Sequence, residues 1–169
     1  MAKVEDYTFE GCTNLIEVIL PDTIQGLGNN SFSDCTSLKT ITIPSSLTYM
    51  GSDTFENCTN LTEIVGINNC IGLTKITGFS NCTSLTEITI PDNVETIDSF
   101  TFSNCTGLTE ITIPDSVKTI RMYAFNKCTN LTSVIYKGTT YTTKSSLSSA
   151  LKANGVKCDS DAFNNAGLK

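Results

Sequence analysis

The sequence contains no histidine, and this absence removes several kinds of chemistry from consideration. Neither a Ser-His-Asp nor a Cys-His arrangement for nucleophilic catalysis is possible, and imidazole nitrogens cannot hold a metal ion. Positive charge is also scarce: the 169 residues include 11 Lys and Arg against 17 Asp and Glu, which gives a formal net charge of −6. Because a nucleic-acid backbone is bound by clustered cations, we predict no nucleic-acid partner.

The sequence also lacks an apolar run long enough to span a bilayer, so we expect no membrane insertion. Residues Met1–Asp6 carry no apolar segment of the kind found in a secretory signal peptide. Instead, Val4–Phe9 aligns with Ile97–Phe102, which lies in the middle of a later repeat. We therefore expect that the chain starts in mid-coil and that upstream repeats or a signal segment have been removed.

What the sequence does contain is an internal repeat. Six cysteines follow one another at intervals of 23, 23, 24, 23 and 23 residues, and each begins the phrase Cys-Thr-x-Leu: Cys12, Cys35, Cys58, Cys82, Cys105 and Cys128. An Ile or Val stands three residues after each of these leucines, and a Phe precedes the next Cys by three residues. A repeat of this length indicates a solenoid rather than a globular core.

The repeat has a physical interpretation. The segment Leu-x-x-Ile-x-Ile predicts a short strand whose apolar side chains point inward and whose Thr and Glu point outward. Proline then ends the strand in four repeats, at Pro21, Pro44, Pro91 and Pro114. We predict a solenoid with parallel short strands on one face, irregular or short-strand return segments on the other, and about five stacked coils.

Residues 1–138 are assigned to this solenoid, and residues 139–169 to a small C-terminal cap in which 145–153 forms a short helix. Between Cys58 and Cys82 a 12-residue spacing brings in Cys70. We predict one coil of 24 residues there, with Cys58 stacked on Cys82 and Cys70 in the column of Val94.

The cysteines admit three interpretations: buried free thiols, disulfides or a metal site. Small apolar thiols suit a core column, and one column offers parallel side chains rather than a tetrahedron. We predict free thiols and no metal or cofactor, with a bridge between stacked rungs left open as the alternative. Cys158 lies outside the ladder and is the best candidate for an exposed thiol.

The run from Cys105 to Cys128, with Ile113-Pro114-Asp115-Ser116-Val117 and Ala124-Phe125, resembles the BspA-like leucine-rich repeat. The resemblance covers about residues 4 to 140. It implies a leucine-rich-repeat solenoid from a bacterial cell-surface or secreted protein that adheres to other molecules, and it supplies no catalytic motif. Gly66 and Gly78 depart from the family pattern, in which proline is usual.

We therefore predict a non-enzymatic binding module whose outer strand face recognises a protein or glycan. The candidate residues of this face are Glu17, Thr40, Thr42, Glu63, Glu87, Thr89, Glu110 and Thr112. Each of them also fits a plain solvated strand surface. The alternative function is a structural spacer or self-assembling segment, monomeric or weakly self-associating through the open N-terminal coil. A carboxylate-based hydrolase is a third hypothesis, disfavoured because no pocket is apparent that would separate two carboxyl pKa values.

Overall fold

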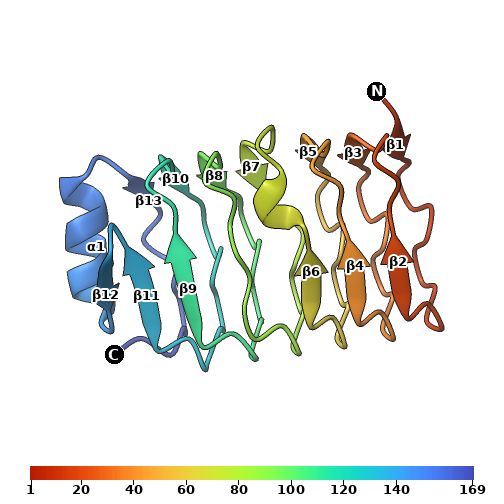
Figure 1. Cartoon of the computed structure of the whole chain (residues 1–169). Helices are drawn as coiled ribbons and strands as arrows, with labels where there is room; N and C mark the ends of the chain where they lie inside the picture. The colour runs from red at the N-terminus through yellow and green to blue at the C-terminus, as the bar shows by residue number, and fades with distance from the viewer.

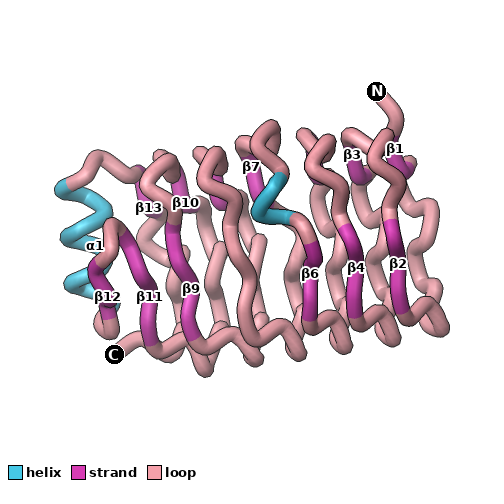
Figure 2. The backbone as a smooth tube through the Cα atoms, in the orientation of Figure 1, coloured by secondary structure: helices cyan, strands magenta, loops and turns pink.

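The protein is a stack of short coils that runs from the N-terminus to a helix-covered C-terminal end (Figure 1). A computed structural model describes all of residues 1–169. Most of each coil is turn and loop, and the strands are short (Figure 2). In chain order the elements are β1 (Lys3–Val4), β2 (Glu17–Ile19), β3 (Gly26–Leu27), β4 (Thr40–Thr42), β5 (Tyr49–Met50), β6 (Glu63–Val65), η1 (Ile67–Asn69), β7 (Lys75–Ile76), β8 (Thr96–Ile97), β9 (Glu110–Ile113), β10 (Thr119–Ile120), β11 (Ser133–Tyr136), β12 (Thr139–Tyr141), α1 (Lys144–Ala153) and β13 (Lys157–Cys158).

Two ladders of strands run along the solenoid. The first, on the strand face, consists of β2-β4-β6 and β9-β11-β12, and the second consists of β1-β3-β5 and β7-β8-β10-β13. Pairing between successive coils is parallel, as the repeat predicts, and only β11 and β12 pair antiparallel. Their turn contains Lys137 and Gly138, both with positive φ, which suits a tight two-residue hairpin.

The core consists of apolar columns that run through the whole stack. Seven phenylalanines form one of these columns, with neighbouring ring centroids 4.8–5.7 Å apart: Phe9, Phe32, Phe55, Phe79, Phe102, Phe125 and Phe163. The five inner rings, from Phe32 to Phe125, are fully buried. Because no single coil buries its own apolar face, this stacking is what stabilises the fold.

A column of cysteines runs beside the phenylalanines. Each buried thiol of this column, from Cys35 to Cys128, donates a hydrogen bond to the phenylalanine carbonyl of the preceding coil, as from Cys58 Sγ to Phe32 O at 3.1 Å and from Cys82 Sγ to Phe55 O at 3.3 Å. Cys70 stands apart and donates to Pro44 O. Cys58 and Cys82 therefore occupy successive rungs, as predicted. All eight cysteines are free thiols. The prediction for Cys158 was only partly right, because this residue is half-buried, as is Cys12.

A third column is polar and lies at the turn before each cysteine. Asp34, Asn57, Asn81 and Asn104 all have φ between 58° and 61°, a left-handed conformation that Asn and Asp tolerate better than most residues. Each asparagine donates from Nδ2 to the side-chain oxygen of the residue one coil earlier, at 2.8 Å in all three cases. This asparagine ladder fixes the register of neighbouring turns.

The coil between Cys58 and Cys82 is a single coil, as predicted, but its internal alignment was predicted wrongly. The strand pairing places Ile76 beside Ile97, and Leu73 donates its N–H to Cys70 O just as Val94 donates to Pro91 O. Leu73, not Cys70, thus occupies the Val94 column. Three residues of η1 are inserted after β6, and the later turn is two residues shorter, ending at Gly78 with φ +92°.

The C-terminal cap covers the last coil. Helix α1 begins after Thr143, whose Oγ1 accepts a hydrogen bond from Ser146 N, and it buries Leu147 and Leu151 against the core. Beyond Gly155, β13 pairs with β10 and places Cys158 beside Ile120. The cap thus contributes a last half-coil in addition to the stacked coils.

Candidate functional site

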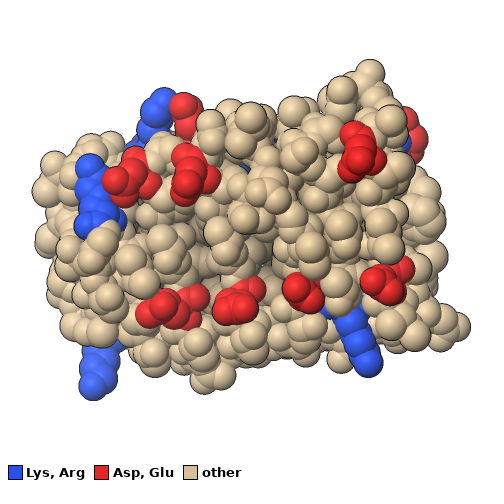
Figure 3. All heavy atoms as spheres, in the orientation of Figure 1, with Lys and Arg blue, Asp and Glu red and all other residues tan.

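The eight predicted residues of the strand face all lie on its outer side, in two neighbouring columns. In one column Glu17 is in register with Thr40 and Thr40 with Glu63, and in the same column Glu110 is in register with Ser133. The second column is offset by two residues and contains Thr42 and Thr112. All four glutamates are exposed. Figure 3 shows a row of carboxylates along the strand face.

The strand face is interrupted at its centre. Residues 86–90 occupy the strand position between β6 and β9, yet they belong to neither sheet. None of their five backbone N–H groups donates to another backbone group, and none of their carbonyls accepts from one. Backbone groups of this kind are normally paired, so this segment leaves donors and acceptors without a backbone partner.

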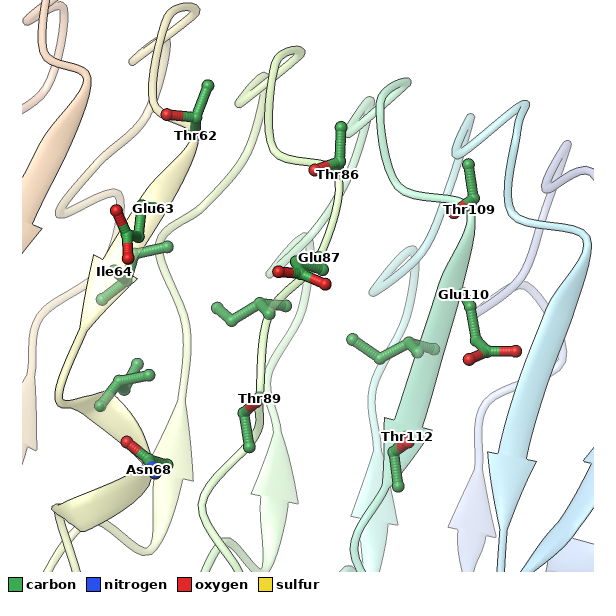
Figure 4. A pocket seen from close by; sticks show the side chains of 13 residues that line it. Thr62, Glu63, Ile64, Asn68, Thr86, Glu87, Thr89, Thr109, Glu110 and Thr112 are labelled. Carbon is green, nitrogen blue, oxygen red and sulfur yellow. The ribbon is translucent and has the colours of Figure 1, made fainter.

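The interruption coincides with a hollow of about 560 Å³ in the strand face. Five of the predicted residues line it, and they come from three successive segments (Figure 4). Its complete lining comprises three glutamates, five threonines, one asparagine and four isoleucines: Glu63, Glu87, Glu110, Thr62, Thr86, Thr89, Thr109, Thr112, Asn68, Ile64, Ile67, Ile88 and Ile111. We call this surface the strand-face hollow.

The structure thus gathers Glu63, Glu87, Thr89, Glu110 and Thr112 but leaves Glu17, Thr40 and Thr42 outside, on β2 and β4. Sequence reasoning missed Ile67 and Asn68, which η1 brings to the wall of the hollow. The signal was present in Gly66, whose φ of +86° turns the chain out of β6 at the position where other repeats have an apolar residue such as Ile43 or Ile90.

The hollow offers polar contacts without an evident reaction centre. Its glutamates are exposed, and Glu110 already accepts a hydrogen bond from Ser133 Oγ at 2.8 Å. No group of three or more Cys, Asp or Glu side chains is placed to hold a metal ion. The chemistry available is hydrogen bonding and attraction of positive charge.

No helix combines the length and apolar character needed to cross a bilayer.

The ladder thiols have raised pKa values because burial penalises the thiolate, to about 11 for Cys35 and about 12 for Cys128. Such thiols are protonated at neutral pH and are poor nucleophiles.

Parallel strands on one face, a 23-residue period and apolar columns define a leucine-rich-repeat solenoid. The BspA type leucine rich repeat region matches the chain in six copies, over residues 1–78 and 67–166. The chain therefore belongs to the BspA type leucine-rich-repeat family. A search of curated proteins gives no significant match.

Solved structures show the same fold. A T. pallidum leucine rich repeat protein is 26% identical with a TM-score of 0.78, covering 94% of this chain and 79% of its own. A leucine rich cell surface protein from Faecalibacterium prausnitzii is 28% identical with a TM-score of 0.71, covering 85% of this chain. A leucine-rich repeat protein from Bacteroides ovatus is 26% identical with a TM-score of 0.60, covering 100%. The chain spans only 35% and 46% of the last two proteins.

Proposed function

We propose that this chain is a non-catalytic binding module of a bacterial cell-surface or secreted protein, and that the strand-face hollow is its contact surface for a protein or glycan partner. The family and the similar F. prausnitzii structure, which is described as a cell surface protein, support the proposed cell-surface or secreted location. The observation that carries the proposal is the hollow itself, where the sheet opens and leaves unpaired backbone groups between three glutamates.

The composition of the hollow favours a positively charged segment of the partner. Glu63, Glu87 and Glu110 come from successive coils, and no lysine or arginine lines the hollow. Like charges on adjacent strands are mutually destabilising, and a bound cation relieves that repulsion. The surrounding threonines and free backbone groups supply hydrogen bonds that fix the orientation of a ligand.

The test is a binding screen against extracellular-matrix proteins and glycans with two matched variants. Glu63→Gln/Glu87→Gln/Glu110→Gln removes the charge of the hollow while preserving side-chain shape. The control, Glu10→Gln/Asp22→Asn/Asp92→Asn, removes the same charge from exposed positions elsewhere. We expect the hollow variant to weaken binding by about tenfold or more and the control to change it by less than about twofold. Equal loss in both variants, or no saturable ligand, contradicts the proposal.

A second candidate function is self-association, and one observation favours it. Residues 7–19 carry four large exposed apolar side chains: Tyr7, Phe9, Ile16 and Ile19 are 57%, 37%, 58% and 72% exposed. Phe9 is the first ring of the phenylalanine column, whereas Ile19 lies on the outer strand face in register with Thr42. Exposed apolar clusters of this kind mark contact surfaces. Sedimentation of the wild type and of Ile16→Lys/Ile19→Lys over a range of concentrations tests this self-association. We expect the wild type to associate and the variant to remain monomeric. A wild type that is monomeric at all concentrations contradicts the proposal.

A further inference from the structure

Charge is distributed very unevenly along the solenoid. Residues 1–120 contain 4 lysines against 15 Asp and Glu, whereas residues 121–169 contain 7 Lys and Arg against 2 Asp. The first part thus carries a formal charge of −11 and the second +5, which together give the net −6. On the face shown in Figure 3, most blue side chains lie at the C-terminal end, away from the acidic row. The net charge of the whole molecule conceals this basic end.

The basic end contains its own hollow, of about 600 Å³, beside the cap helix. Lys144, Ser148 and Lys152 follow one another at intervals of four residues and so lie on one face of α1. Lys157 of β13 reaches the same hollow, with Ser160 and Asn164 completing the polar lining. We call this surface the basic hollow, and its volume lies within the usual range for ligand sites.

The positive charges of the three lysines of the basic hollow are not paired with a carboxylate of the protein. None of them forms an ion pair, although Lys3, Lys75, Lys118 and Arg121 all do. The lining contains one carboxylate, Asp159. Cys158 adds no negative charge, because burial and the nearby Asp159 and Asp161 raise the pKa of its thiol to about 11.

The floor of the basic hollow is apolar. Phe163, the last ring of the phenylalanine column, and Val156 both line it, and each retains 7% of its surface exposed. An apolar floor beneath a cationic and hydroxyl-bearing rim matches a ligand with a hydrocarbon face and peripheral anionic groups. A pyranose ring with carboxylate or sulfate substituents has this construction.

We propose that the basic hollow is a second binding site, separate from the strand-face hollow, and that its ligand is an anionic glycan bearing carboxylate or sulfate groups. Lys144, Lys152 and Lys157 pair with the anionic groups. Ser148, Ser160 and Asn164 hydrogen-bond to sugar hydroxyls. The acidic remainder of the solenoid repels a polyanion, so it confines the contact to the cap.

The surface chemistry favours a glycan over a lipid bilayer. Peripheral binding to membranes combines basic residues with apolar side chains that insert among the lipids. The large exposed apolar side chains of this chain all lie between Met1 and Met122, and none belongs to the cap. A concave basic surface without such side chains fits a polar chain rather than a bilayer.

The experiment compares three proteins on immobilised heparin and on neutral dextran. Lys144→Gln/Lys152→Gln/Lys157→Gln removes the charge of the basic hollow. Lys39→Gln/Lys127→Gln/Lys137→Gln is the matched control, since these three exposed lysines lie outside the basic hollow and form no ion pair. Both variants have the same net charge, and circular dichroism verifies that both are folded.

We expect the wild type and the control variant to bind heparin saturably and not to bind dextran. The variant of the basic hollow should bind heparin about tenfold more weakly. The slope of log affinity against log salt concentration should fall by two to three in the hollow variant, since each neutralised anion contributes about one. Equal weakening in both variants, or no retention on heparin, overturns the proposal. So does equally tight binding to phosphatidylserine vesicles, which identifies a membrane site, or association of the wild type that the hollow variant abolishes, which identifies a second copy as the occupant.

Discussion

The thiol of Cys82 donates to the carbonyl oxygen of Phe55, 27 residues earlier and one coil away, at 3.3 Å. Cys82 is fully buried, whereas Cys12 is half-buried. We expect Cys82→Ala to lower the free energy of unfolding by about 1–2 kcal/mol, through a small cavity and a lost hydrogen bond. Cys12→Ala should cost less than half as much. Urea-induced unfolding measures both, and equal effects would show that burial in the ladder is unimportant.

The buried thiols should make the fold sensitive to alkali. Burial raises the pKa of Cys35 and Cys70 to about 11 and of Cys128 to about 12, from an ordinary value of 9.0. The unfolded chain therefore releases these protons first, so stability is intact below pH 9 and falls as pH rises toward 11–12. Each such thiol contributes about 1.4 kcal/mol per pH unit in that window.

Urea unfolding at pH 8, 9 and 10 checks this dependence. Cys128→Ala is the matched control, because it removes one of the titrating thiols and should lessen the fall per pH unit. A stability that stays level from pH 8 to pH 10, or an unchanged slope in the variant, would contradict the assignment of the effect to the thiols.

A lysine in the glutamate column should stabilise the solenoid. Thr40 of β4 lies in register between Glu17 of β2 and Glu63 of β6. Thr40→Lys therefore places a cation between two carboxylates and should raise the free energy of unfolding by about 0.2–1 kcal/mol. The gain should shrink in high salt, which screens exposed charges. Thr40→Gln, similar in size but neutral, is the control, and an equal gain there would exclude an electrostatic cause.

Gly78 is required by the shortened turn in the coil between Cys58 and Cys82. Its φ is +92°, and a Cβ atom there would lie 2.8 Å from the backbone nitrogen of Thr54. Gly78→Ala should therefore destabilise by about 1–3 kcal/mol, through strain and a clash with backbone. Gly138→Ala also has positive φ, but its Cβ meets nothing within 4 Å, so it should cost less. Thermal unfolding of both variants measures the two contributions: Gly138→Ala reports the strain of positive φ alone, and the further loss in Gly78→Ala reports the clash with backbone.

Much of the fold could be predicted from the sequence because the period itself encodes position. Residues 23 apart, such as Glu17 and Thr40, occupy neighbouring rungs in register. Period alone failed where an insertion and a deletion nearly cancel. Relative to the 23-residue coils, the coil between Cys58 and Cys82 has three additional residues at η1 and two fewer before Phe79. Counting from Cys58 therefore placed Cys70 in the column that Leu73 occupies.

The candidate site was less predictable. Residues 85–90 carry the same Leu-x-x-Ile-x-Ile pattern as residues 108–113, yet only the latter include a paired strand. The two segments share one local pattern, so the pattern alone cannot show which of them pairs with its neighbours. The basic end was visible in the sequence, since 7 of the 11 cations follow residue 120, but its three lysines converge only through the packing of α1 on the last half-coil.

The asparagine ladder has a consequence for how this chain tolerates sugar attachment. Asn57, Asn81 and Asn104 each begin an Asn-Cys-Thr sequence, the acceptor pattern for N-linked glycans. The atom that would carry the glycan is Nδ2, which in all three donates to the preceding rung at 2.8 Å. The Nδ2 amide has two hydrogens, so a glycan replaces one of them and leaves the other able to donate. Because all three amides are half-buried, the bulk of an attached sugar crowds the neighbouring rung, so glycosylation and stacking compete at these turns when the chain is made in a eukaryotic secretory pathway.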